Sequence, residues 1–170
     1  KAVVNLKKLF ENRQVYKSYV ALAQGKISEN LRIEANMDLA NDYDDVKMRM
    51  RICEDGKSAV TEILPIEYFA DIDATLVRAV PLTGRQHQIR LHLFHVEHKI
   101  LGEPLYGLSR PQIEKILDKE MSKAERILTT GAPRLLLHSD EICFKFDGVE
   151  YKIKSKFDAR NEFYKLVKSK

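Results

Sequence analysis

The chain has 170 residues and a mass of 19.7 kDa, with 44% hydrophobic and 32% charged side chains. These values fit one globular domain, residues 1–170, and leave too little chain for a second full domain. There is no run of about 18 apolar residues, and the first ten residues lack the long apolar stretch of a secretory signal. We therefore expect a soluble, cytoplasmic protein with no membrane partner.

The net charge of +4 and a pI near 9.0 permit a nucleic-acid partner without establishing one. The charge is segregated: residues 1–18 hold five basic side chains and one acid, and residues 152–170 hold seven basic and two acidic. An electropositive face and ordinary solvated surface charge both fit this pattern. Cys53 and Cys143 match neither a CxxC metal pair nor a disulfide framework, so we expect free thiols in a reducing compartment.

A helix is predicted at the start of the chain, where Val3, Leu6 and Phe10 recur at helical spacing. The next segment, VYKSYVALA, alternates in the manner of a strand and is rich in aromatic and β-branched residues. Gly25 ends it. The pattern thus predicts a helix followed directly by a strand that carries Tyr19 on one face.

Short apolar runs separated by turn-rich pieces predict antiparallel strands near 31–37, 46–53, 59–66 and 74–81. The tetrapeptide EDGK between the second and third of these predicts a hairpin tip, with Gly56 supplying a positive φ.

The periodicity changes after residue 85, where Ile89, Leu93 and Val96 fall on one face of a predicted helix. Ser109 before Arg-Pro predicts a second helix start. Asp147-Gly148 between two strand-like runs predicts a hairpin, and ARNEFYKLVKSK predicts a final helix. Together these elements predict an α+β domain with a mixed, mostly antiparallel sheet and flanking helices.

The segment TGRQHQIRLHLFH, residues 83–95, concentrates side chains that carry chemistry. Its histidines do not form the HExxH pair of a zinc site and no cysteine is near, so a polar helix face explains them better than a metal. An anion site is the other reading, in which the Thr83-Gly84 turn supplies backbone N–H groups and Arg85 and Arg90 supply forked cationic donors. From these residues alone, surface or structural arginines fit as well.

The longer segment TGRQHQIRLHLFHVEHKILGEPLYG resembles the TGRxHQIRxHL…PILGDxLYG signature of the RluA-type RNA pseudouridine synthases. VYKSYVALAQG is similar to their VxKxYxALVxG segment, KSAVTEI to GKxAxTxY, and PRLLLHSDEICFKF to PRLxLHAxxLxFxHP. A match of this extent is far more specific than a lone glycine motif. It implies the pseudouridine synthase fold, incomplete at the N-terminus, and a parent enzyme that isomerises uridine to pseudouridine in rRNA or tRNA without metal or cofactor.

The resemblance also implies roles for individual residues. Arg90 stands where the family has an arginine that pairs with the catalytic aspartate, and Tyr19 where a tyrosine packs against the uracil after the nucleotide has been extruded. By the same resemblance, Leu137 is expected to line this pocket. Thr83, Gly84 and Arg85 are expected to bind substrate because of the anion site that their residue types indicate. From the residues alone, Tyr19 and Leu137 fit a strand aromatic and plain core, and Arg90 fits a structural salt bridge.

The sequence departs from the family pattern because the HRLDxxTSG segment that carries the aspartate is absent. We therefore expect the 170 residues to be inactive alone. If the missing segment forms strands beside the strand that carries Tyr19, its absence uncovers a sheet edge there, and we expect the chain to self-associate. A non-catalytic RNA-binding module on the same scaffold is the alternative function. Glu97 replaces a family glycine, which makes a positive φ and an altered turn a question there, and Glu103 replaces an aspartate with its charge kept.

Overall fold

The computed structural model describes residues 2–40 and 49–168. Its helices are α1 (Ala2–Glu11), α2 (Gln88–His95), α3 (Arg110–Leu117), α4 (Lys123–Thr130) and α5 (Ala159–Lys168). Its strands are β1 (Val15–Gln24), β2 (Leu31–Glu34), β3 (Met37–Leu39), β4 (Met50–Ile52), β5 (Val60–Phe69), β6 (Ala74–Pro81), β7 (Leu137–Phe146) and β8 (Val149–Lys154).

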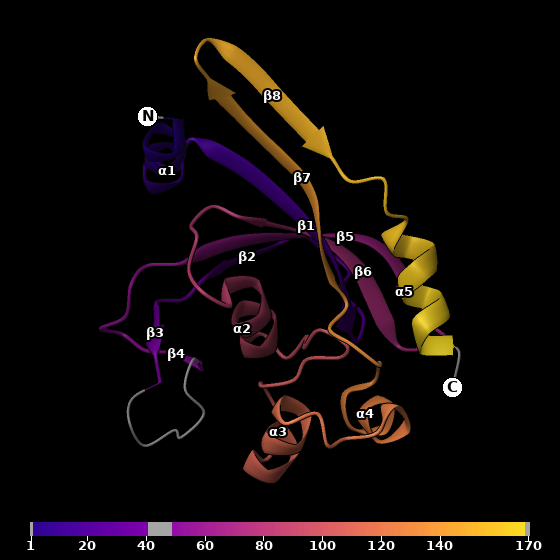
Figure 1. Ribbon diagram of the computed structural model, residues 1–170. Coiled ribbons are helices and arrows are strands. Elements are labelled where there is room, and N and C mark those ends of the chain that lie inside the picture. Colours follow the sequence, from indigo (N-terminus) through magenta and orange to yellow (C-terminus); the bar gives the residue numbers. More distant parts are fainter. Residues whose placement is uncertain (1, 41–48, 169–170) are drawn as a thin grey trace.

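A six-stranded sheet in the order β2-β5-β6-β1-β7-β8 forms the centre of the molecule, and β3 and β4 form a separate pair. Neighbouring strands of the large sheet are antiparallel throughout. Figure 1 shows α2 close to the sheet, α3 and α4 farther from it, and the β7–β8 hairpin projecting away from those helices. The predicted α+β fold with a mostly antiparallel sheet is confirmed, and the parallel pairing of a mixed sheet is not seen among the described strands.

Strand β1 lies at the centre of the core. Its residues Ala21, Leu22 and Ala23 are fully buried. Because consecutive side chains of a strand point to opposite faces, burial at successive positions means that both faces of β1 are covered. Leu93 of α2 and Phe163 of α5 belong to the same core cluster. The helices therefore hold the strand that carries Tyr19 in a rigid setting.

Several sequence predictions are confirmed. The N-terminal helix, the first strand and the final helix form as α1, β1 and α5. Asp147 and Gly148 join β7 to β8 with positive φ at both positions, as the hairpin signal predicts. Cys53 and Cys143 form no disulfide. The strand predicted over 46–53 is found at Met50–Ile52, and its residues 46–48 lie outside the described part of the chain.

The hairpin predicted at EDGK is wrong. Strand β4 pairs with β3 rather than with β5, and Gly56 has no positive φ. The segment instead folds over Met37, whose backbone N–H and carbonyl exchange hydrogen bonds of 3.0 Å with Lys57. A β-carbon at Gly56 would lie 2.7 Å from the Met37 nitrogen. Glycine is therefore needed here for close backbone approach, which local sequence does not reveal.

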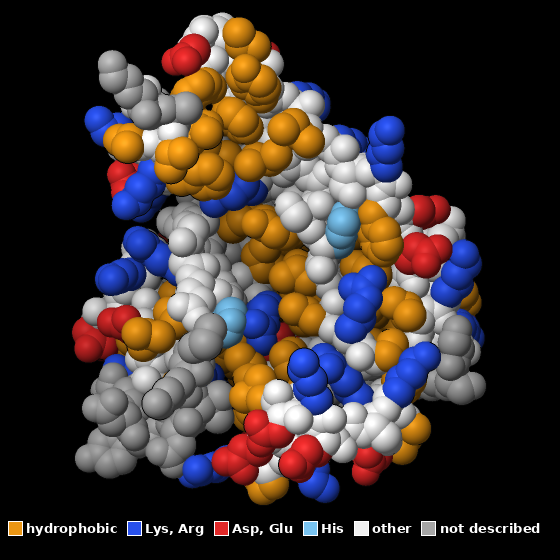
Figure 2. Space-filling model, viewed as in Figure 1, with side chains coloured by type: hydrophobic (Ala, Val, Ile, Leu, Met, Phe, Trp, Pro, Cys, Tyr) orange, Lys and Arg blue, Asp and Glu red, His pale blue; other side chains and the backbone are white. Residues whose placement is uncertain are grey.

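Hydrophobic side chains gather on the surface of the β7–β8 hairpin, as Figure 2 shows at the top of the view. Val149, Tyr151 and Ile153 of β8 are exposed there. In the part of the chain that the structure describes, no helix is both long enough and apolar enough to cross a membrane.

Candidate functional site

A hollow of about 220 Å³ lies where β1 and the start of β7 meet the turn after β6 and the beginning of α2. It brings together all six candidate residues of the sequence analysis: Tyr19, Thr83, Gly84, Arg85, Arg90 and Leu137. The remaining lining residues are Lys17, Pro81, His87, Gln88 and Ile89. Residues more than a hundred positions apart in the chain thus converge on one small space.

Tyr19 and Leu137 form the strand side of the hollow. They lie on adjacent antiparallel strands, and the register between β1 and β7 shifts at Ser18 and Tyr19. Ser18 pairs with Glu141 and Tyr19 with Ser139, so Asp140 is an extra residue on β7. A bulge of this kind bends the strand and re-aims the side chains beside it. Both Tyr19 and Leu137 are partly buried and keep some exposed surface on the hollow.

Gln88 holds the turn that forms the opposite wall. Its side-chain oxygen accepts hydrogen bonds from the Thr83 hydroxyl at 2.7 Å and from the Arg85 backbone N–H at 3.0 Å. Its amide nitrogen donates to the Val60 carbonyl and the Thr61 hydroxyl, both at 2.9 Å. The Thr83 hydroxyl also accepts from Val60 N–H at 3.0 Å. Thr83 therefore fixes the turn, and its hydroxyl is already committed within the protein.

Arg90 makes a two-pronged ion pair with Glu103. Its Nε and Nη2 atoms donate to the two carboxylate oxygens at 2.7 and 2.6 Å, and the two side chains are 12% and 0% exposed. Glu103 also accepts from the Leu105 backbone N–H at 2.8 Å. Such planar, charge-assisted contacts fix the direction of a guanidinium. Nη1 has no hydrogen-bond partner among the described residues, so one edge of Arg90 is still able to bind a ligand.

Lys17 and Arg85 add positive charge to the hollow. Among the described residues, neither forms an ion pair with a carboxylate, and the Arg85 Nε donates to the Ser58 carbonyl at 3.2 Å. Partial burial lowers the pKa of Lys17. The sequence analysis selected Arg85 but not Lys17, although the two-residue spacing of Lys17 and Tyr19 on one strand placed both side chains on the same face.

His87 precedes α2 in a left-handed conformation, with φ of 55°. Its Nδ1 atom lies 3.2 Å from the hydroxyl of the buried Tyr106. Burial lowers the pKa of His87, and the nearby positive charge of Arg90 lowers it further. Both effects favour the neutral imidazole at the edge of the hollow.

Glu97 also lies in the left-handed region, with φ of 65°. The turn after α2 thus keeps the backbone conformation that glycine favours, although the residue is glutamate. Glutamate at this position therefore carries some backbone strain that glycine would avoid.

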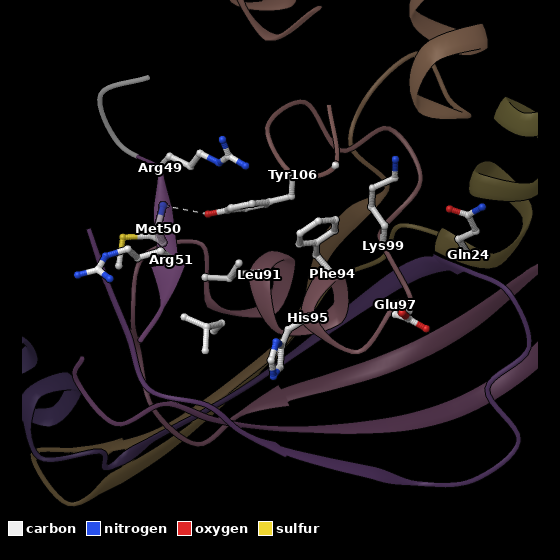
Figure 3. Close-up of a pocket in the computed structure, with 12 residues that line it drawn as sticks. Gln24, Arg49, Met50, Arg51, Leu91, Phe94, His95, Glu97, Lys99 and Tyr106 are labelled. Atoms are coloured by element: carbon white, nitrogen blue, oxygen red, sulfur yellow. Dashed lines mark hydrogen bonds between the residues drawn. The ribbon is translucent and has the colours of Figure 1, made fainter. Parts of the chain in front are cut away.

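A second, larger hollow of about 770 Å³ lies on the other side of Tyr106, between β4 and α2. Figure 3 shows the Tyr106 hydroxyl reaching the backbone of Met50, with Arg49 directed toward the same ring. Phe94 stacks on Tyr106 with ring centroids 5.9 Å apart. None of the predicted site residues lines this hollow. Nor do the described residues include a group of three or more His, Cys, Asp or Glu side chains placed to hold a metal ion.

Comparison with known proteins identifies the relatives of the chain. The family model for RNA pseudouridylate synthase matches residues 1–95. An uncharacterized RNA pseudouridine synthase of Helicobacter pylori is 36% identical over 160 residues, which cover 94% of this chain and 51% of that protein. The dual-specificity RNA pseudouridine synthase RluA of Pasteurella multocida is 33% identical over 141 residues, covering 82% of this chain and 55% of its own length. The chain spans about half the length of these curated relatives.

Among solved structures, human RNA pseudouridylate synthase domain containing 1 matches 96% of this chain and 70% of its own chain, with a TM-score of 0.67. The sequence identity is 19%, so this similarity establishes the fold alone. The sequence matches and the structural match agree with the resemblance seen in the motifs.

Proposed function

This chain belongs to the RluA-type family of RNA pseudouridine synthases, and we propose that it is the larger, C-terminal part of a catalytic domain whose hollow receives an extruded uridine. The intact enzyme would cleave the N-glycosidic bond, rotate the uracil and rejoin it through carbon, in rRNA or tRNA in the cytoplasm. One observation carries the proposal: Tyr19, Arg90 and Leu137 converge on a single space of about 220 Å³.

Tyr19 and Leu137 would hold the base. An enzyme that acts on a base inside folded RNA must take that base out of its stack and give it a new surface. The Tyr19 ring offers an aromatic face and Leu137 an apolar wall, and both border the hollow. Stacking on an aromatic side chain contributes about 1–3 kcal/mol per base.

Arg90 would orient the catalytic aspartate, which no motif in this chain supplies. Glu103 occupies the Nε and Nη2 atoms of Arg90. A second carboxylate would therefore bind at Nη1, and its ionised form would be stabilised by the adjacent positive charge. The aspartate would act as the nucleophile that divides the isomerisation into easier steps.

Lys17 and Arg85 would bind the phosphates that flank the uridine. A hollow of about 320 Å³ beside the site is lined by Arg13 and Arg85, with Glu11 also on its wall, and it extends the site toward the end of α1. Contacts with phosphate position RNA without reading its sequence, and they make binding sensitive to salt.

Activity is tested by tritium release from RNA that contains tritiated uridine. Because nothing in the chain matches the HRLD segment, we expect no release above background from the 170 residues alone. Robust turnover by this chain would show that the nucleophile lies within it, and would overturn the proposal that an aspartate outside these 170 residues is the nucleophile.

Phosphate binding is tested by the salt dependence of RNA affinity. We expect Lys17→Ala and Arg85→Ala each to reduce the slope of log affinity against log salt by about one, because each removes one phosphate contact. Lys145→Ala is the matched control, since Lys145 is an exposed lysine of β7 that does not line the hollow. Unchanged slopes in both variants would show that Lys17 and Arg85 do not contact phosphate and have a structural role instead.

A non-catalytic RNA-binding module is the second candidate, because Arg90 already has a buried carboxylate partner in Glu103. Tyr19→Ala separates the two functions. If an extruded base stacks on Tyr19, RNA affinity falls about five- to hundredfold. If the chain binds only the phosphates of RNA, the RNA affinity of Tyr19→Ala is unchanged, and the proposed uridine pocket is rejected.

A further inference from the structure

The hydroxyl of Tyr106 has two polar neighbours and a single proton to share between them. Tyr106 is 1% exposed, and the backbone N–H of Met50 donates to its oxygen at 3.2 Å. Burial raises the pKa of Tyr106, so the phenol keeps its proton. A buried hydroxyl proton without an acceptor is costly, and the Tyr106 proton therefore needs an acceptor of its own.

Within the described part of the chain, His87 supplies that acceptor. Its Nδ1 lies 3.2 Å from the Tyr106 oxygen, and the two rings meet edge to face with centroids 6.1 Å apart. Since Met50 N–H already donates to the phenol, the proton between the rings belongs to Tyr106 and is donated to Nδ1. A neutral imidazole that accepts at Nδ1 carries its own proton on Nε2.

The Nε2–H group of His87 is then left for a ligand. Nε2 has no hydrogen-bond partner among the described residues, and the His87 side chain lines the hollow. His87 makes no side-chain capping bond to α2, although it occupies the capping position with φ of 55°. Backbone strain of this kind is common at functional sites, and His87 carries it at the edge of the hollow.

We propose that His87 presents its Nε2–H group to the O4 carbonyl of the base that enters the hollow, and that it thereby selects uracil over cytosine. Uracil has a carbonyl acceptor at this position, whereas cytosine has an amino group that donates. A donor facing a donor leaves both groups unpaired. This inference rests on the proposed function, because it assumes that a pyrimidine occupies the hollow.

The tautomer is tested by long-range proton–nitrogen NMR spectra of the labelled chain at neutral pH. We expect the His87 resonances of a neutral ring protonated at Nε2, and a mixture of tautomers in Tyr106→Phe, which lacks the donated proton. A ring protonated at Nδ1 in the unmodified chain, or an imidazolium, would overturn the inference without touching the proposed function.

Selectivity is tested by the affinities of oligouridylate and oligocytidylate of equal length. His87→Gly removes the ring and suits a positive φ, and His95→Ala is the control, an exposed histidine of α2 that does not line the hollow. We expect the unmodified chain to prefer oligouridylate, and His87→Gly to lose about fivefold of that preference, the value of one hydrogen bond. His95→Ala should keep it.

The outcomes separate the two claims. No preference for uridine in the unmodified chain would overturn the proposed uridine pocket. A preference that survives in His87→Gly would overturn only the assignment to His87.

Discussion

At the scale of single residues, the Arg90–Glu103 ion pair contributes both to the proposed site and to the stability of the fold. The Glu103 carboxylate is fully buried and is satisfied by Arg90 and by the Leu105 backbone N–H. The Arg90 guanidinium lies 5.5 Å from the centre of the Tyr106 ring. A buried charge of this kind is tolerated only while its partners stay in place.

Glu103→Gln should destabilise the protein by about 3–5 kcal/mol, because the substitution leaves the Arg90 charge buried without a counter-ion. Denaturant unfolding followed by circular dichroism measures this. Glu62→Gln breaks an exposed pair with Arg32 and serves as the control, with an expected loss of about 0–1 kcal/mol. Equal effects of the two substitutions would show that burial of Glu103 carries no special cost.

His92 makes stability depend on pH. It is fully buried, its Nε2 lies 3.2 Å from the Ala35 carbonyl, and its Nδ1 has no partner among the described residues. Burial lowers the pKa of His92. An unfolded histidine titrates near a pKa of about 6.5, so between the two pKa values the unfolded state binds a proton that the folded state does not.

The free energy of unfolding should therefore fall as the pH decreases from neutral to about 5, and His92→Gln should flatten that fall. Glutamine keeps a donor for the Ala35 carbonyl but does not titrate. His87, whose pKa is also lowered, leaves part of the pH dependence in place. Chemical denaturation across this pH range measures the slope, and the same slope in both proteins would exclude His92 as its source.

The connection between α2 and α3 is the element that places Glu103 under Arg90. Leu101 N–H donates to the Leu22 carbonyl of β1, and its own carbonyl accepts from Leu136 N–H, each at 2.9 Å. Gly102 follows with φ of 79°, and a β-carbon there would overlap the carbonyl oxygen of Arg134. The loop thus runs so close to the start of β7 that only glycine fits.

Gly102→Ala should cost more than about 4 kcal/mol, whereas Gly148→Ala should cost about 1–2 kcal/mol. Both glycines have a φ near 80°, but a β-carbon at Gly148 would meet no atom within 4 Å. The pair therefore separates the steric clash from the backbone strain. Thermal unfolding of the two variants measures their loss of stability. Similar losses in both would mean that the Arg134 carbonyl moves aside at little cost.

Local patterns predicted the elements whose causes are local. The helical spacing in α1, the alternation in β1 and the Asp147-Gly148 turn all formed as expected. The β3–β4 pairing and the role of Gly56 escaped prediction because they depend on Met37, about twenty positions away. Helix α4 was also missed, although its sequence carries local signals: Ser122 and Glu125 form a capping box, and Gly131 ends the helix in a left-handed conformation.

The candidate site was also predicted only in part. The resemblance to the family motifs implied roles for Tyr19, Arg90 and Leu137, and the fold brings them to one hollow. The hydrogen bonds by which Gln88 holds the turn were not predicted. They join Gln88 to Thr83 in the turn after β6 and to residues of β5, which lie far from it in the sequence. A structural salt bridge at Arg90 was one of the two readings, but its partner Glu103 was not predicted, since an ion pair between a helix and a loop leaves no periodic signal in the sequence.

At the scale of the whole molecule, the sheet edge expected beside the Tyr19 strand is not found, because β1 pairs with β6 on one side and with β7 on the other. The edges of the large sheet are β2 and β8, and they differ. Edge strand β2 is short and carries charged side chains, which discourage pairing with another sheet. Edge strand β8 is exposed at every position and presents Val149, Tyr151 and Ile153 on one face. Two β8 strands paired antiparallel about Tyr151 would place Glu150 of each copy opposite Lys152 of the other.

The isolated chain should therefore self-associate as its concentration rises, and Ile153→Lys should shift the equilibrium toward monomer. Leu128→Lys is the control, because Leu128 is an exposed leucine of α4, away from the sheet edge. Light scattering from micromolar to millimolar protein measures the mean mass. A clean monomer over the whole range would refute the expected association.

The extra residue on β7 decides which face of the sheet Leu137 occupies. If β7 kept every residue and continued in a regular ladder from the Ser18–Glu141 pair, Asp140 would lie opposite Tyr19 and Leu137 opposite Leu22. Leu137 would then point to the other face of the sheet, and the hollow would lose one wall. A substitution at Asp140 that preserves the bulge therefore preserves this wall, whereas a slip of β7 into regular register removes it.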